Sequence, residues 1–521
     1  MNLADLLRET AETFPDKPAL IFHDRPITFS QLDERVDLTA AALAGLGVVK
    51  GDRVALLIGN VPEFATSLYG AMRAGAAVCP LNVMLTPEEM GYILADSGAK
   101  AAVTELPSLP GLLSVRDRLA DLQTILVVGG PPAPSRTISL EEALRSAGEP
   151  PAITIESSDL AVIAYTAGTT AAPKGAMLTH QSLLANLDQL SQVPDLAETH
   201  EDVAFLALPM FHIYALNVIL GMTVKTGATA VMVERFEPEE TLALIERHRV
   251  TVLFGAPPMF SALLALPDAP ARALSGVRLA VSGAASLPAE VFEAFRDRFG
   301  VTIWEGYGLT ECGPAVTSNA MGGEAKSGSI GLPLPGMEIR LVDEHGEDAE
   351  EDDPGELWVK GPNVFAGYWN RPEATAEVLE GEWLKTGDVA YRDEDGYIHL
   401  VDRKKDLIIV SGFNVYPTEI EEAIERHPKV AEAAVVGAPD ERTGEAVQAW
   451  VVPKEGQSLT GEEILDFLHG YLARFKQPRD IEIVDELPHH VTGKVLRRVL
   501  RGEELLGDVQ SEQAPQGGEG S

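Results

Sequence analysis

The run YTAGTTAAPKG (residues 165–175) places threonine hydroxyls, glycines and one lysine directly after the apolar residues 160–164. Backbone N–H groups, hydroxyls and a cation in one loop can surround a phosphate chain. The run is not a GxxxxGK[ST] loop, because Pro173 precedes Lys174 and Gly175 follows it. This composition indicates a nucleotide loop outside the common kinase and ATPase type. A plain surface turn is the alternative interpretation.

Two later runs carry groups that suit the rest of a nucleotide. WEGYGLTE (304–311) contains Tyr307, whose ring can stack on a purine, and Glu311, whose carboxylate can hold Mg²⁺. WLKTGD (383–388) ends in Asp388, which could accept hydrogen bonds from both ribose hydroxyls. Taken singly, these residues are equally well explained as a core tyrosine, a capping glutamate and a turn aspartate.

Two charged runs follow in the last quarter of the chain. DRKKD (402–406) is a hinge-like cluster between two β patterns, and HHVTGK (489–494) is a glycine turn that presents Lys494. A lone surface lysine is the ordinary interpretation of Lys494.

The elements that must position these residues alternate between strand and helix. Short apolar runs separated by helix-length segments predict two α/β subdomains with βαβ order. The predicted strands are 54–58, 76–79, 101–103 and 125–128, then 205–208, 229–233, 252–254 and 277–281. Helices are predicted at 238–248 and 288–299, with Pro238 and Pro288 in their first turns. A β-rich lobe is expected from about residue 330, then a compact α+β region from Asp406.

Composition narrows the class of protein. With 521 residues, 41 Lys+Arg and 79 Asp+Glu, the formal net charge is −38. Such a field repels nucleic acid and anionic lipid, so we expect neither as a partner. No apolar run approaches the ~20 residues of a membrane span, and the start lacks a secretory signal. Two cysteines form no metal or disulfide framework, so a cytoplasmic protein is predicted.

Taken together, the motifs resemble those of the adenylate-forming superfamily, which includes acyl-CoA and aryl-CoA ligases, carrier-protein adenylation domains and beetle luciferases. The resemblance covers residues 3 to 503, and the motifs occur in the order and spacing of the family. It rests on the runs 165–175, 307–311, 355–368, 386–388, 402–419 and 492–494. The family loop usually reads Thr-Ser-Gly-Thr-Thr-Gly, whereas Ala167 and Ala171 stand here.

The resemblance implies ATP-dependent activation of a carboxylic acid to an acyl-adenylate, followed by transfer to a thiol with release of AMP. It implies catalytic roles for Lys494, Thr310, Glu311 and His212, and Mg²⁺ ligation by Glu311 and Thr166. It further implies that ATP and coenzyme A are bound by Thr166, Gly168, Thr169, Thr170, Lys174, Ala284, Ala285, Gly306, Tyr307, Gly308, Asp388, Arg403, Lys405 and Gly412.

The acid is expected to be apolar. PMFHIYAL (209–216) resembles the segment that separates the acyl pocket from the thiol channel in acyl-CoA and aryl-CoA members, and His212 is its most specific residue. A fatty acid is favoured. The alternatives are an aryl-acid CoA ligase, a ligase that loads a carrier protein, a luciferase-like monooxygenase, and a non-catalytic nucleotide-binding regulator. A monomer or homodimer is expected.

The predicted architecture is therefore α/β, with a large N-terminal domain and a small mobile C-terminal domain. We expect the core at 1–404, the mobile lid at 405–505 and a disordered tail at 506–521. The resemblance implies that the lid rotates about Lys405, presenting Lys494 for adenylation and Gly412 for thioester formation.

Overall fold

The computed structural model describes most of the chain. The described residues are 2–130, 137–166, 173–194, 197–267, 269–343, 345–350, 353–403, 406–410, 413–440, 444–469, 472, 474–489 and 495–502. The chain divides into two compact units, Met1–Ile339 with Val359–Leu384, and Arg340–Trp358 with Lys385–Ser521. The predicted tail at 506–521 lies outside the described residues.

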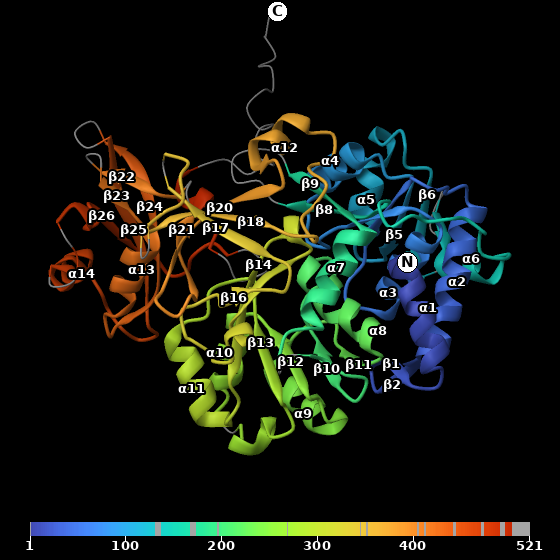
Figure 1. Cartoon of the computed structure of the whole chain (residues 1–521), viewed down its shortest axis with the longest axis horizontal. Coiled ribbons are helices and arrows are strands. Elements are labelled where there is room, and N and C mark those ends of the chain that lie inside the picture. The colour runs from blue at the N-terminus through green and yellow to red at the C-terminus, as the bar shows by residue number, and fades with distance from the viewer. Residues whose placement is uncertain are drawn as a thin grey trace, which may run out of the picture. The chain divides into compact units, whose positions relative to one another are not determined.

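A seven-stranded sheet within the described residues ends in the hairpin strands β8 and β9, which flank the glycine–threonine run in the sequence (Figure 1). Its order is β7-β6-β5-β3-β4-β8-β9, parallel except for the β8–β9 hairpin. The strands are β3 (Arg53–Leu57), β4 (Ala77–Pro80), β5 (Ala101–Glu105), β6 (Thr124–Val128), β7 (Thr137–Ser139), β8 (Leu160–Thr166) and β9 (Lys174–Thr179). β4 and the centres of β3, β5 and β6 are buried, as expected for parallel strands covered on both faces.

A nine-stranded sheet, again counting only the described residues, carries the WEGYGLTE run. Its order is β16-β15-β14-β13-β12-β10-β11-β1-β2. The strands are β1 (Pro18–Phe22), β2 (Arg25–Thr28), β10 (Val203–Leu206), β11 (Thr229–Met232), β12 (Val252–Gly255), β13 (Leu279–Ser282), β14 (Ile303–Gly308), β15 (Ala315–Ser318) and β16 (Leu332–Pro333). The predicted alternation of strand and helix is thus confirmed.

Helices of the first unit follow the local signals of the sequence. α9 (Pro238–His248) has proline at its first position, Glu239 and Glu240 in its first turn and His248 in its last, which complements the helix dipole. Pro288 was expected inside a first turn but is the N-cap of α11 (Ala289–Phe299). The other helices are α1 (Leu3–Thr13), α2 (Phe29–Gly45), α3 (Pro62–Arg73), α4 (Pro87–Ser97), α5 (Leu109–Val115), α6 (Leu140–Arg145), α7 (His180–Leu190), α8 (Met222–Thr226), α10 (Pro257–Ala265) and α12 (Pro372–Val378).

The β-rich lobe and the C-terminal α+β region each form a five-stranded sheet within the described residues. The lobe contains β17 (Glu338–Val342), β18 (Gly355–Lys360), β19 (Leu379–Glu380), β20 (Trp383–Arg392) and β21 (Ile398–Arg403). The C-terminal region contains β22 (Ile408–Val410), β23 (Phe413–Val415), β24 (Val430–Asp440), β25 (Gly444–Pro453) and β26 (Asp480–Ile483), with α13 (Pro417–Glu425), α14 (Gly461–Leu468) and α15 (Arg497–Leu500).

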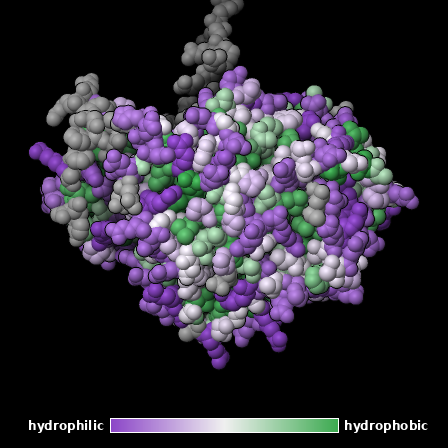
Figure 2. All heavy atoms as spheres, in the orientation of Figure 1, coloured by the Kyte–Doolittle hydropathy of each residue, from purple (hydrophilic) through white to green (hydrophobic). Residues whose placement is uncertain are grey.

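The domain boundary predicted between 404 and 405 stays a prediction, because both residues lie outside the described ranges. By packing, the chain already passes from one unit to the other at Leu384 and Lys385. None of the helices in the described ranges combines the length and the apolar character needed to cross a bilayer. Figure 2 shows one face of the molecule, where hydrophilic residues predominate and hydrophobic ones are scattered in small groups.

Candidate functional site

The β8–β9 hairpin brings Thr166 and Lys174 together. The two strands run antiparallel, and Thr166 and Lys174 are directly opposite each other at the end of the ladder. Both side chains are partly buried. The loop between them contains Gly168, Thr169 and Thr170, which lie outside the described residues, so their predicted roles stay predictions.

Tyr368 joins two of the predicted site residues. Its hydroxyl donates a 2.7 Å hydrogen bond to Glu311 Oε1, and Lys174 Nζ lies 5.2 Å from the centroid of its ring. The predicted phosphate-binding lysine and the predicted metal-binding carboxylate therefore contact one side chain. The lysine lies over the face of its ring, and the carboxylate accepts from its hydroxyl. Sequence reasoning included Tyr368 in a motif but gave it no role.

Three buried amide side chains hold the turn that carries Glu311. This turn is a 3-10 helix, Thr310–Cys312, which follows β14. Asn217 donates to the Gly313 carbonyl (2.7 Å), Asn363 to the Cys312 carbonyl (2.8 Å) and Asn186 to the Ala315 carbonyl (2.8 Å). Nothing in the local sequence marked these asparagines, because each lies far along the chain from the turn.

The segment before Glu311 requires glycine at position 308. A Cβ there would lie 2.3 Å from the carbonyl oxygen of Pro314, a distance that no side chain tolerates. Tyr307 lies in register with Thr317, and Gly306 with Ser318, on the antiparallel β14–β15 pair. The predicted purine-stacking tyrosine and the predicted metal ligand are therefore held on one short rigid segment.

Ala284 and Ala285, predicted to line the adenine, lie just after β13. Ala284 has φ +71, a left-handed conformation that residues other than glycine rarely adopt and that is often found at functional sites. The Leu287 N–H in the same loop donates a 3.3 Å hydrogen bond to Oε1 of the buried Glu305. Burial raises the pKa of Glu305 to about 8, and the hydrogen bond from Leu287 only partly opposes this. Glu305 therefore supports the loop mainly as a neutral acid at pH 7.

His212 lies at the entrance to an unusual helix. The Tyr214 N–H donates to His212 Nδ1 (3.3 Å), which leaves Nε2 to carry the proton of the neutral ring. Tyr214–Gly221 form a π-helix, a conformation common at functional sites, and all eight of its residues are buried. Tyr214 packs so closely on Gly283 that a Cβ at that glycine would lie 3.0 Å from the ring.

The second unit holds a separate pair. Asp388 on β20 and Arg403 on β21 are directly opposite each other in an antiparallel ladder. Asp388 is buried, and its N–H donates to the hydroxyl of Thr386, which itself donates to the Leu357 carbonyl. Lys405, Gly412 and Lys494 lie outside the described residues, so their roles stay predictions.

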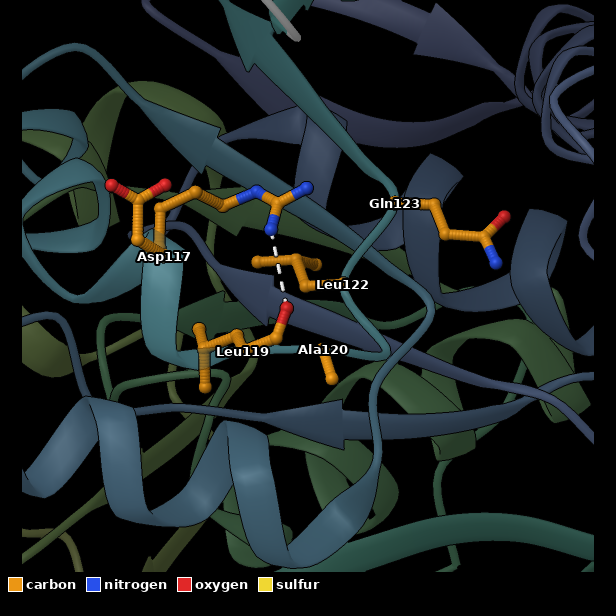
Figure 3. Close-up of a pocket in the computed structure, with 6 residues that line it drawn as sticks. Asp117, Leu119, Ala120, Leu122 and Gln123 are labelled. Carbon is orange, nitrogen blue, oxygen red and sulfur yellow. Dashed lines mark hydrogen bonds between the residues drawn. The ribbon is translucent and has the colours of Figure 1, made fainter.

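Two surface pockets lie away from these residues. Figure 3 shows the first, of about 390 Å³, in which the Arg116 side chain donates to the Leu119 carbonyl at 3.2 Å. The second, of about 400 Å³, is in the other unit and is lined in part by Asp406, Gln448 and Arg501. Neither pocket is lined by a predicted site residue, so the chemistry of the side chains is a better guide to the site than the size of these pockets.

Comparison with known proteins tests the resemblance that the motifs indicate. The sequence model of the AMP-binding enzyme family matches residues 7–369, and that of the AMP-binding enzyme C-terminal domain matches residues 419–494. A long-chain-fatty-acid–CoA ligase of Yersinia pestis is 39% identical over 97% of this chain and 94% of its own length. A feruloyl-CoA synthase of an Amycolatopsis species is 38% identical over 94% of this chain and 96% of its own length.

Solved structures give the same result. The ATP-bound MatB of Rhodopseudomonas palustris superposes with a TM-score of 0.89 at 35% identity, covering 96% of this chain and 99% of that one. The anthranilate CoA ligase AuaEII in complex with anthranoyl-AMP superposes with a TM-score of 0.87 at 32% identity, covering 96% and 97%. The predicted α/β fold and adenylate-forming class are thus confirmed, and the chain belongs to the AMP-binding enzyme family.

Proposed function

We propose that this protein is an AMP-forming acid–CoA ligase that activates an apolar carboxylic acid, with a fatty acid as the first choice. The observation that carries the proposal is the convergence of Lys174, at the start of β9, and Glu311 on Tyr368. A cation for phosphate and a carboxylate for a metal are the two groups that a nucleoside triphosphate requires.

In the first half-reaction, an oxygen of the substrate carboxylate attacks the α-phosphate of ATP. A bond forms to phosphorus, the bond to the pyrophosphate leaving group breaks, and the acid becomes an acyl-adenylate. The substrate is its own nucleophile, so the protein has to orient the carboxylate and stabilise charge at phosphorus. We assign the charge stabilisation to Lys174 and Lys494, and hydroxyl donation to Thr166 and Thr310.

The donor set at Glu311 fits Mg²⁺. Mg²⁺ is usually held by one or two carboxylates together with substrate phosphates. One oxygen of Glu311 accepts from Tyr368, and no hydrogen bond or ion pair to the other oxygen is found within the described residues. Those residues contain no cluster of three or more acidic, histidine or cysteine ligands. When bound, the ion would neutralise phosphate charge. Glu311 would orient it, and the phosphates would complete its shell.

In the second half-reaction, a thiolate attacks the acyl carbonyl, AMP leaves and a thioester forms. We infer that coenzyme A supplies the thiol, because the relatives that support this assignment are named as CoA ligases and a CoA synthase. The acid would lie along the buried π-helix, Tyr214–Gly221, with His212 at the boundary with the thiol. The prediction of a cytoplasmic enzyme is supported by Cys79 and Cys312, both buried and unpaired.

An aromatic acid is the second candidate, on a specific observation. Tyr214 lies over Gly283 and meets Phe254 edge to face, with ring centroids 6.3 Å apart. Aromatic walls of this kind favour a flat ring as well as an alkyl chain. The feruloyl-CoA synthase among the relatives supports the same alternative.

The decisive experiment measures pyrophosphate release over a panel of fatty and aromatic acids, with CoA, with holo acyl carrier protein, and with neither. We expect acid-dependent release, and thioester formation with CoA. If thioester forms with the carrier protein but not with CoA, the carrier protein is the acyl acceptor. Pyrophosphate release that no acid stimulates would contradict the ligase assignment and favour a nucleotide-binding regulator.

A further inference from the structure

Lys174 and Glu311 carry opposite charges close to the same ring, yet they do not pair with each other. The contact that Lys174 makes through Nζ is with the face of Tyr368, and Glu311 Oε1 accepts from the hydroxyl of the same residue. Within the described residues, neither charge has an ion-pair partner at 4.0 Å or less. One tyrosine therefore contacts both charged groups.

The position of Tyr368 is built into the fold. Residues 366–369 run antiparallel beside β9, with hydrogen bonds from Met177 N to Gly367 O (2.9 Å), Ala366 N to Met177 O (2.9 Å) and Trp369 N to Gly175 O (2.8 Å). The Tyr368 N–H donates to the Thr375 hydroxyl at 2.8 Å, and Phe365 meets its ring edge to face. The tyrosine is held in place by backbone pairing on one side and a helix on the other.

The same segment also fixes the backbone of Glu311. The Phe365 N–H donates to the Glu311 carbonyl at 2.8 Å, so the segment that carries Tyr368 also ties down the main chain of its partner. Gly367 has φ +111, and a Cβ there would lie 2.6 Å from Thr375. Any side chain at 367 would push this segment away from α12.

We propose that Tyr368 is a positioning residue that holds Lys174 and Glu311 in place and keeps them from pairing with each other. A direct Lys–Glu ion pair would neutralise the two groups that the phosphates and the metal need. The aromatic face attracts the ammonium group without neutralising it. The hydroxyl occupies one oxygen of the carboxylate and so directs the other toward a cation. This inference rests on the proposed function, because it assumes that the two groups serve a nucleoside triphosphate and Mg²⁺.

The test uses direct binding of ATP to the full-length protein by calorimetry, first in EDTA and then in a Mg²⁺ titration. Tyr368→Phe keeps the ring and removes the hydroxyl. We expect its affinity for ATP in EDTA to match wild type, while the Mg²⁺ concentration at half-effect rises about tenfold, the scale of one hydrogen bond to a charged group. Tyr69→Phe, at a buried position in α3, is the matched control and should leave both values unchanged.

Tyr368→Leu removes the ring as well. We expect it to lose ATP affinity even in EDTA, because Lys174 then pairs with Glu311. The double variant Tyr368→Leu with Glu311→Gln should regain affinity in EDTA relative to Tyr368→Leu, since the competing carboxylate charge is gone, while remaining insensitive to Mg²⁺. A merely structural role for Tyr368 would give no such recovery. Thermal unfolding of each variant establishes that the protein is folded.

The outcomes are distinguishable. If wild type binds no ATP under any condition, the proposed function fails, and this inference fails with it. If wild type binds ATP with a Mg²⁺ dependence but Tyr368→Phe has the same dependence, the role of the hydroxyl is wrong while the ligase assignment stands. If the double variant is no better than Tyr368→Leu, the separation of the two charges is not what Tyr368 provides.

Discussion

The hydroxyl of Tyr165 donates a 2.8 Å hydrogen bond to Oδ2 of Asp96, and so fastens the strand that enters the glycine–threonine loop to the end of α4. Asp96 also accepts from Arg371 (2.7 Å) through its other oxygen, and its carbonyl accepts from the Trp369 indole (3.0 Å). Trp369 and Arg371 follow Tyr368 within three positions. One aspartate therefore anchors both β8 and the segment that carries Tyr368.

This anchor predicts a measurable effect of Tyr165→Phe. Loss of one hydrogen bond to a partly buried carboxylate should lower the free energy of unfolding by about 1.5 kcal/mol and weaken ATP binding, because β8 loses its fixed position. Urea unfolding and calorimetric ATP titration measure the two effects. Tyr69→Phe, the same substitution at a buried position of α3, serves as control. A stability equal to that of wild type would show that the Tyr165 hydroxyl contributes nothing to the anchor.

Asp388→Ala should weaken binding of ATP and AMP by about 1.5 to 3 kcal/mol, the cost of losing hydrogen bonds to a charged acceptor. Asp388 is buried, and its backbone lies opposite Arg403 in the β20–β21 ladder, the two residues predicted to hold the ribose. Glu394→Gln, an exposed change on the loop between β20 and β21, is the control. Unchanged nucleotide affinity in Asp388→Ala would mean that the Thr-Gly-Asp segment is only a turn.

Lys494→Ala and Lys405→Pro should separate the two half-reactions. Lys494→Ala loses charge stabilisation at phosphorus, so it should form acyl-adenylate slowly yet convert supplied acyl-adenylate and CoA to thioester. Lys405→Pro restricts the backbone φ at the predicted hinge and should do the reverse. Single-turnover assays of each half-reaction provide the measurement. Equal loss of both half-reactions in both variants would exclude an alternating lid.

Stability should fall as the pH rises, in part because of Glu198. This carboxyl group is 6% exposed, and among the described residues neither of its oxygens has a hydrogen-bond partner. Burial, and then the charge of Asp202, raise its pKa from 4.5 to about 8, against the opposing effects of Arg278 and Lys17. Between these two values the folded protein binds more protons than the unfolded chain. The free energy of unfolding therefore decreases with rising pH, by at most about 1.4 kcal/mol per pH unit from this group.

Glu198→Gln removes that dependence, so its stability relative to wild type should improve steadily from pH 5 to pH 8. Urea unfolding at intervals of one pH unit measures the slope, and Glu201→Gln, at an exposed position, should leave it unchanged. Glu305, whose pKa is also about 8, contributes to the pH dependence of the free energy of unfolding in every variant. It therefore accounts for dependence that remains in Glu198→Gln. Parallel curves for wild type and Glu198→Gln would mean that Glu198 is already ionised at pH 5.

Local pattern was enough to predict much of the fold. The apolar runs that became β3, β5 and β6 needed no knowledge of their neighbours, because a strand buried on both faces is apolar throughout. The limits of α9 follow from Pro238 and the last-turn His248. Pro288 was misplaced by one position because a proline can either precede a helix or begin it, and the sequence does not distinguish the two.

The sequence by itself determined the family and the identity of the chemical groups, because six short motifs in fixed order cannot be explained by composition alone. Only the tertiary structure decided which groups meet. Tyr368 lies between Lys174 and Glu311, and Asn186, Asn217 and Asn363 converge on one turn. These partners are distant in the chain, and a side chain's type indicates what it can bond but not what the packing of other elements brings within its reach.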